Sequence, residues 1–166
     1  MNGTNGHRRS GRGSAGAGPP VVHGHERPPG ADDGTVAAVG KVSEALEWVE
    51  RARGRLYDFH QMLGHADFLF EEAADALESC GQPGLAEELR VHLVGRNVLE
   101  GRWTFQVVDE FDDLYHAEAT RCETLVRDEL MDGRRHVFEA ELKERRRTRG
   151  LRGHEGVPAE LARPPA

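Results

Sequence analysis

The 166-residue sequence predicts an all-α protein, a long antiparallel helical hairpin or bundle with a short corner helix, a C-terminal helix and disordered tails. Three observations predict this fold class. A heptad stripe of apolar residues fills the first half of the chain, and a second segment with helical period follows about twenty residues later. The two ends, in contrast, are rich in Gly, Pro, Ala and Arg.

The first long helix is predicted over residues 35–79, where apolar residues follow a 3-then-4 spacing. One column of this stripe holds Val42, Val49, Leu56, Leu63, Phe70 and Leu77, and the column three residues further holds Ala45, Ala52, Phe59, Ala66, Ala73 and Cys80. Asp33 or Thr35 can cap the start of the helix, and Gly81 with Pro83 ends it. The stripe continues across the glycines inside it, so we expect one continuous helix.

The other helices are expected at residues 83–94, 103–131 and 134–147. The first of them is a short corner helix that begins with a proline, which suits the first turn of a helix. The connection between the two long helices is long enough for the second to fold back on the first. We therefore expect residues 35–147 to form one helical domain.

The two ends, residues 1–34 and 148–166, are predicted to be disordered tails. They contain almost no large apolar residues, so they cannot bury enough surface to offset the entropy of ordering. The second tail is basic and rich in proline. No apolar run is long enough for a transmembrane helix and no signal-peptide pattern is present, so we expect no membrane partner and a cytoplasmic protein.

Charge is distributed unevenly along the chain. Residues 35–132 carry 9 Lys and Arg against 21 Asp and Glu, a net charge of −12, whereas residues 133–166 carry a net charge of +4. An acidic body disfavours a nucleic-acid groove on the domain itself. The basic run of residues 143–152 leaves one alternative open, contact with nucleic acid through phosphates alone, because no aromatic residue in it offers a stacking platform.

A second apolar flank beside the stripe points to a protein partner. Trp48, Met62 and Leu69 lie at spacings of seven or fourteen residues, and a lone hairpin leaves them exposed. A homodimer, or the packing of the short helices, would cover them. Arg102 and Trp103, at the predicted corner, are residue types common in interfaces. Our first hypothesis is therefore a non-enzymatic helical interaction or scaffold protein that forms a homodimer.

The alternative hypothesis is a metal-binding, ferritin-like helical protein, which could be an oxidoreductase using iron, manganese or zinc. If Cys80 lies level with about Thr104, His116 falls near Phe68 and Asp113 near Glu71. The candidate ligands would then be at one height: Asp67, Glu71, Asp113 and His116. Di-iron bundles carry a Glu-x-x-His pair on each of two helices, and this chain has one such pair, with Asp in place of Glu. A solvated acidic face explains the same residues.

We expect structural roles for the two cysteines, Cys80 and Cys122, and for Glu118, all of which lie on apolar helix faces. The same antiparallel estimate separates Cys80 from Cys122 by about 27 Å, too far for a disulfide within one chain, so both are expected to be buried thiols. Glu118 needs a partner on the apolar side, and Arg121 or an arginine of the first helix can supply it. Phosphate-loop, dinucleotide-binding, zinc-protease and serine-hydrolase motifs are all absent from the sequence, so we expect no catalytic residue.

Three segments carry a resemblance to a known family. They are residues 55–61 (RLYDFHQ), 94–106 (VGRNVLEGRWTFQ) and 133–139 (GRRHVFE). In these segments the chain resembles a family of small helical actinobacterial proteins that has no assigned activity, and the resemblance extends over about residues 40–150. It implies a bacterial cytoplasmic protein and supplies no catalytic residue.

Overall fold

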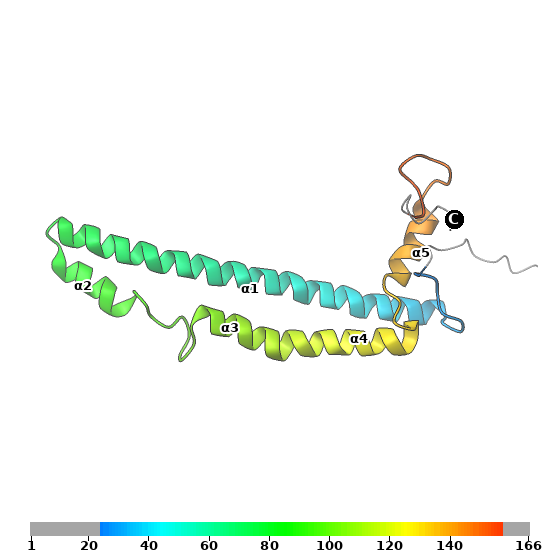
Figure 1. Ribbon diagram of the computed structural model, residues 1–166, viewed down its shortest axis with the longest axis horizontal. Helices are drawn as coiled ribbons and strands as arrows, with labels where there is room; N and C mark the ends of the chain where they lie inside the picture. Colours follow the sequence, from blue (N-terminus) through cyan, green and yellow to red (C-terminus); the bar gives the residue numbers. More distant parts are fainter. Residues whose placement is uncertain (1–23, 158–166) are drawn as a thin grey trace, which may run out of the picture.

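A computed structural model of the protein describes residues 24–157. The elements in this range are α1 (Asp33–Ser79), α2 (Pro83–His92), α3 (Thr104–Phe111), the π-helical turn η1 (Asp112–His116), α4 (Ala117–Met131) and α5 (Val137–Arg146), with no β-strand among them. Figure 1 shows α1 as one long rod, the chain returning beside it, and α5 across the end where α1 begins. The predicted all-α hairpin is confirmed.

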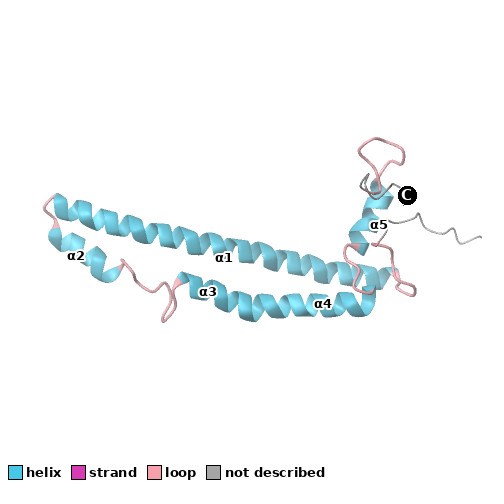
Figure 2. Cartoon of the chain, viewed as in Figure 1, coloured by secondary structure: helices cyan, strands magenta, loops and turns pink. Residues whose placement is uncertain are grey.

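The helix bounds follow local signals and differ from the predicted ones by a few residues. α1 begins two residues early because Asp32, and not Asp33 or Thr35, is its N-cap, and Asp32 Oδ1 accepts a hydrogen bond from the Thr35 backbone N at 2.7 Å. α4 ends where Asp132 takes a left-handed conformation with φ of 51°, followed by Gly133 with φ of 72°. Figure 2 shows an extended loop between α2 and α3.

The ordered region also begins before residue 35, where the predicted domain starts. Arg27 forms two hydrogen bonds of 2.8 Å with the carboxylate of Glu141 on α5. Arg134 donates to the backbone O of Glu26 at 2.8 Å. Through these contacts residues 24–32 pack on α5 and on the segment before it, at the end of the hairpin where α1 begins. Residues 1–23 and 158–166, which hold most of the predicted tails, lie outside the described residues.

The returning arm, by which we mean residues 83–131, keeps one antiparallel register along α1. Residue 50 lies beside 116, 53 beside 112, 60 beside 104 and 67 beside 95, so residue i of α1 faces about 165 − i. Arg90 of α2 continues this register by pairing with Asp75 at 2.7 Å. α2 is therefore the first part of the returning arm: this short helix follows the turn at residues 80–82 and runs back along α1.

Because α2 runs back along α1, every residue of the returning arm lies at a different height along α1 from the one expected from the sequence. Aligning Thr104 with Cys80, as the sequence suggests, places residue i of α1 opposite about 184 − i. In the structure α2 and the following loop lie beside the last turns of α1. That alignment is therefore wrong by about 19 residues, which is about 28 Å along the helix.

A small apolar core lies at the end of the hairpin where α5 packs. Val36 and Val39 of α1, Met131 of α4 and Val137 of α5 form one buried cluster with exposed fractions from 1 to 7 %. Gly40 allows α5 to approach α1 closely, because a Cβ there would lie 3.1 Å from the Phe138 side chain. We call this region the packed end. No helix within residues 24–157 is long and apolar enough to cross a membrane.

Candidate functional site

Polar side chains join α1 to the returning arm over the middle of the hairpin. Arg53 Nε and Nη2 donate to the two carboxylate oxygens of Asp112, both at 2.7 Å. The Tyr57 hydroxyl lies 3.2 Å from Asp112 Oδ2, and His116 Nε2 lies 2.7 Å from Glu50 Oε1. We call these five residues the polar seam. It fixes which turn of the arm lies beside which turn of α1, because each group needs its own partner.

The Arg53–Asp112 pair is the strongest electrostatic contact of the seam. The side chains are 34 % and 23 % exposed, so water screens them only in part. The bidentate hydrogen bond from the Arg53 guanidinium lowers the pKa of Asp112 below its ordinary value, and the same bond raises the pKa of Arg53. Both groups therefore stay charged at neutral pH.

The same side of α1 supplies two further polar contacts. His60 Nδ1 lies 2.7 Å from Thr104 Oγ1, at the start of α3. Asp67 Oδ1 accepts a hydrogen bond from the backbone N of Gly95 at 2.8 Å. Arg53, His60 and Asp67 recur every seven residues, so this face of α1 is a row of polar groups, each with a partner on the returning arm.

A π-helical turn, η1, presents the seam residues of the arm to α1. Val108 is buried, and both Asp112 and His116 contact α1, at a spacing of four residues. In a regular α-helix each such step rotates the contact by about 40°, so the three residues would span about 80°. The wider π turn between Asp112 and His116 takes up one extra residue and reduces that rotation.

The two sides of the hairpin have different compositions. Each residue turns the helix by about 100°, so the residues just before and just after an inward-facing residue lie on opposite sides. A two-fold axis relates the two helices of an antiparallel pair, so positions that precede inward-facing residues share one side of both helices. The inward-facing residues are Leu46, Arg53, His60, Asp67 and Ala74 on α1 and Thr104, Val108, Asp112, His116 and Glu123 on the arm.

The side formed by the preceding residues is apolar. We call it the apolar flank; it consists of Ala45, Ala52, Phe59, Ala66 and Ala73 on α1 and of Val107, Phe111, Tyr115 and Cys122 on the arm. Phe59 is 37 % exposed and Tyr115 is 63 % exposed. The alanine column of the heptad stripe is thus not the face that packs on the arm. The arm meets the column containing Arg53 and His60 and, beside it, the half-buried column of Val49, Leu56 and Leu63.

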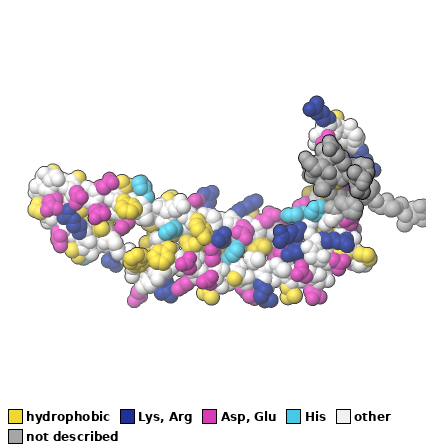
Figure 3. All heavy atoms as spheres, viewed as in Figure 1, with side chains coloured by type: hydrophobic (Ala, Val, Ile, Leu, Met, Phe, Trp, Pro, Cys, Tyr) yellow, Lys and Arg dark blue, Asp and Glu magenta, His cyan; other side chains and the backbone are white. Residues whose placement is uncertain are grey.

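The opposite side, the polar flank, is formed by the residues that follow inward-facing positions. Its members are Glu47, Gly54, Gln61, Phe68 and Asp75 on α1 and Phe105, Asp109, Asp113, Ala117 and Thr124 on the arm. Apart from its two phenylalanines, it presents polar or small side chains. α5 covers its end through the contact of Phe138 with Gly40, which lies seven residues before Glu47. Figure 3 shows one face of the molecule, where charged side chains of both signs cover α1 and α4.

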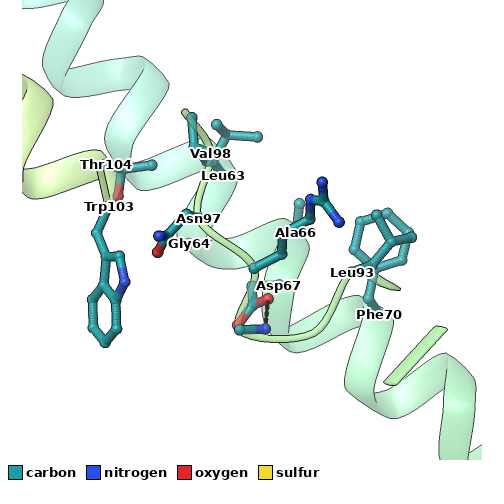
Figure 4. A pocket seen from close by; sticks show the side chains of 12 residues that line it. Leu63, Gly64, Ala66, Asp67, Phe70, Leu93, Asn97, Val98, Trp103 and Thr104 are labelled. Atoms are coloured by element: carbon teal, nitrogen blue, oxygen red, sulfur yellow. Dashed lines mark hydrogen bonds between the residues drawn. The ribbon is translucent and has the colours of Figure 1, made fainter. Parts of the chain in front are cut away.

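A cavity of about 430 Å³ opens where the returning arm is not helical. Figure 4 shows Asp67 at its centre, with Trp103 and Thr104 on one side and Phe70 and Leu93 on the other. Its walls are mainly apolar, and Ala66 of the apolar flank lines it together with Trp103. The cavity is therefore continuous with the apolar flank.

The four candidate metal ligands are not brought to one height. His116 contacts Glu50 and lies about 17 residues, or about 25 Å, from the level of Asp67, because the register differs from the one assumed. Asp67 instead holds the loop at Gly95. Within residues 24–157 no three His, Cys, Asp or Glu side chains are grouped to hold a metal ion. Metal binding stays a prediction, and it would require a different arrangement of these residues.

The predicted interface residues lie on the surface. Trp48, Met62 and Leu69 are 61, 64 and 49 % exposed, and Trp103 packs edge-to-face on Phe105 with ring centroids 5.8 Å apart. Arg102 is engaged within the chain, since its Nε lies 2.6 Å from Glu110 Oε1. Sequence reasoning named the exposed column of α1 and Trp103, and it missed Val107, Phe111 and Tyr115, whose signal is their four-residue spacing.

The two thiols and Glu118 differ from the expectation of buried groups. Cys80 and Cys122 are both free and exposed, so the prediction of buried thiols is wrong. Glu118 does pair with Arg121, with contacts of 2.6 and 2.9 Å, and this hydrogen bonding lowers the pKa of Glu118. The pair is on the surface, however, because the arm turns that side of α4 away from α1.

The basic run at the end of α5 is partly neutralised within the chain. Glu144, 6 % exposed, pairs with Arg147 and Arg149, and Glu141 pairs with Arg145. Nucleic-acid contact through this run stays a prediction. In comparisons with known proteins, no family model, no curated protein and no solved structure matches the chain.

Proposed function

We propose that this protein is a non-enzymatic helical interaction protein that acts through the apolar flank and associates as a homodimer. The observation that carries the proposal is the row of exposed and half-buried apolar side chains that both arms contribute to one side of the hairpin. Trp48, Met62 and Leu69, next to the alanine column, widen that row. Contiguous apolar surface of this kind is typical of protein interaction sites.

The thin core of the hairpin supports the proposal. Met131 is the one large side chain that is fully buried among residues 24–157. Two helices in contact bury one stripe each, and a second layer of helices is the usual way to bury the neighbouring stripe. Packing another pair of helices against the apolar flank would supply that layer.

Light scattering coupled to size-exclusion chromatography tests the proposal. We expect the full chain to elute as a dimer at tens of micromolar. Ala52→Glu places a charge in the middle of the apolar flank at an exposed helix position, where Glu costs little in helix propensity. We expect this variant to weaken dimerisation at least tenfold.

Gln61→Glu is the matched control, because it adds the same charge at an exposed position on the polar flank. It should leave the dimer intact. A wild-type chain that stays monomeric at these concentrations would refute the homodimer. Equal effects of the two charges would show that the apolar flank is not the contact surface.

A further inference from the structure

We infer that the second copy packs with its returning arm on α1 of the first, about a two-fold axis parallel to the helices. This inference rests on the proposed function and specifies which surfaces meet. In this arrangement the apolar flanks face each other, α1 of each copy lies against the arm of the other, and the two hairpin tips are at the same end. A two-fold axis parallel to the helices produces no shift along them. Residue i of α1 in one copy is therefore level with about residue 165 − i of the arm in the other copy.

The sizes of the side chains on the apolar flank favour this pairing. On α1 the flank is almost entirely alanine, with Phe59 as its one large member, whereas the arm presents Phe111 and Tyr115. In the register of 165 − i, these two rings of one copy lie on either side of Ala52 of the other, and the same match occurs twice. Packing α1 on α1 would instead set alanines against alanines and leave the aromatic rings to crowd one another.

The charges at the edge of the apolar flank favour the same pairing. α1 carries Lys41 and Arg55 in the column of Trp48 and Met62, and the arm carries Glu110 and Glu118 at its matching outer edge. The basic edge of α1 therefore meets the acidic edge of the arm when α1 faces the arm. In the register of 165 − i, Arg55 is level with Glu110 of the second copy, which within its own chain pairs with Arg102.

The same register brings predicted interface residues of both arms together. Met62 of one copy is level with about residue 103 of the other, which is Trp103. A methionine sulfur at an aromatic ring is a favourable contact. The exposed positions of both side chains, 64 % for Met62 and 58 % for Trp103, leave room for it.

Cys122 offers a direct test because it is free, exposed and part of the apolar flank. The Ser43 Oγ to Glu123 Oε1 hydrogen bond of 3.1 Å shows that this turn of the arm is level with the turn of α1 that contains Ala45. Within one chain, residues 45 and 122 lie side by side on separate helices about 10 Å apart, too far for a disulfide. Between two copies in the inferred arrangement, their Cβ atoms point toward each other.

The experiment uses the full chain with Cys80→Ser, which removes the thiol at the hairpin tip, and adds Ala45→Cys. After mild oxidation we expect a covalent dimer on a non-reducing denaturing gel, formed by a disulfide between residue 45 of one copy and Cys122 of the other. Oxidation removes two protons and two electrons, which the added copper–phenanthroline and oxygen accept. Adding Cys122→Ser should abolish the covalent dimer.

Glu47→Cys in the same background is the matched control, since it places an exposed thiol two residues away on the polar flank and should not cross-link. Cross-linking of the Glu47 variant as efficient as that of the Ala45 variant would overturn the inference. A dimer by light scattering without a covalent product from Ala45→Cys would also overturn it while leaving the proposed function intact. A monomer by light scattering would refute both the inferred arrangement and the proposed homodimer.

Discussion

At the packed end, α1 and α4 meet through Val36, Val39 and Met131. About two heptads further along, α1 meets η1 through Arg53 with Asp112 and Glu50 with His116. Apolar contacts gain free energy by excluding water and accept many partners of similar size. Ion pairs and hydrogen bonds gain less on balance, but each requires one particular partner. The packed end therefore supplies stability, and the polar seam supplies register.

The largest expected effect comes from changing the length of the arm between these two regions. Deleting Thr120, in the regular α-helix, rotates the seam against the packed end by about 100°, so Met131 and Asp112 can no longer both face α1. We expect loss of cooperative urea unfolding followed by circular dichroism.

Deleting Asp113 is the matched control, because this exposed residue lies in the π turn and its removal converts that turn to a regular helix. We expect cooperative unfolding to survive this deletion. Equal damage from both deletions would show that η1 does not take up the extra residue.

Met131→Ala tests the packed end and has the next largest effect. Truncating this fully buried side chain should lower the free energy of unfolding by about 3 kcal/mol, as measured by urea denaturation at one fixed protein concentration. Leu85→Ala, at a position 56 % exposed on α2, should change it by less than about 0.5 kcal/mol. The effect of Met131→Ala should not depend on pH, and a small effect would mean that the packed end is not the stabilising region.

Asp112→Asn tests the seam and has the smallest effect. The pKa of Asp112 is lowered in the folded state, so its charge stabilises the fold at neutral pH. That contribution declines as the pH falls below about 4, the ordinary pKa of an aspartate, and is gone once the pH is below the folded-state pKa. The urea midpoints of wild type and variant should therefore differ at pH 7 and converge in acid.

Asp113→Asn removes the same charge from the neighbouring exposed residue and should shift the midpoint less. Two variants that lose the same amount of stability, with no change on acidification, would show that the Arg53–Asp112 bond contributes nothing specific. Comparing the two variants therefore separates the effect of the Arg53–Asp112 bond on stability from the effect of changing the net charge.

The sequence predicts the helices well because their signals are local. Pro83, Gly81 and the Asp132-Gly133 pair end or begin helices by backbone geometry that neighbouring residues alone determine. The heptad stripe likewise predicts a continuous α1, since its period holds across the internal glycines.

The register and the π turn could not be predicted, because both depend on residues far apart in the sequence. Helical period shows that Val42 and Ala45 share a face, but it does not say which edge of that face the arm will occupy. The arm settles beside Arg53 and His60 because Asp112 and Thr104 offer partners there. The candidate metal ligands inherited the error in register, since they were grouped only by assumed height.

The loop of residues 93–103 has a mechanical consequence. Along most of its length the molecule is two helices thick, but beside the cavity of about 430 Å³ only α1 is helical, and Gly64 lines that point. The stiffness of a rod rises steeply with its thickness, so bending concentrates at its thinnest section. A load applied across the hairpin would therefore flex it near Gly64 and leave the packed end and the polar seam straight.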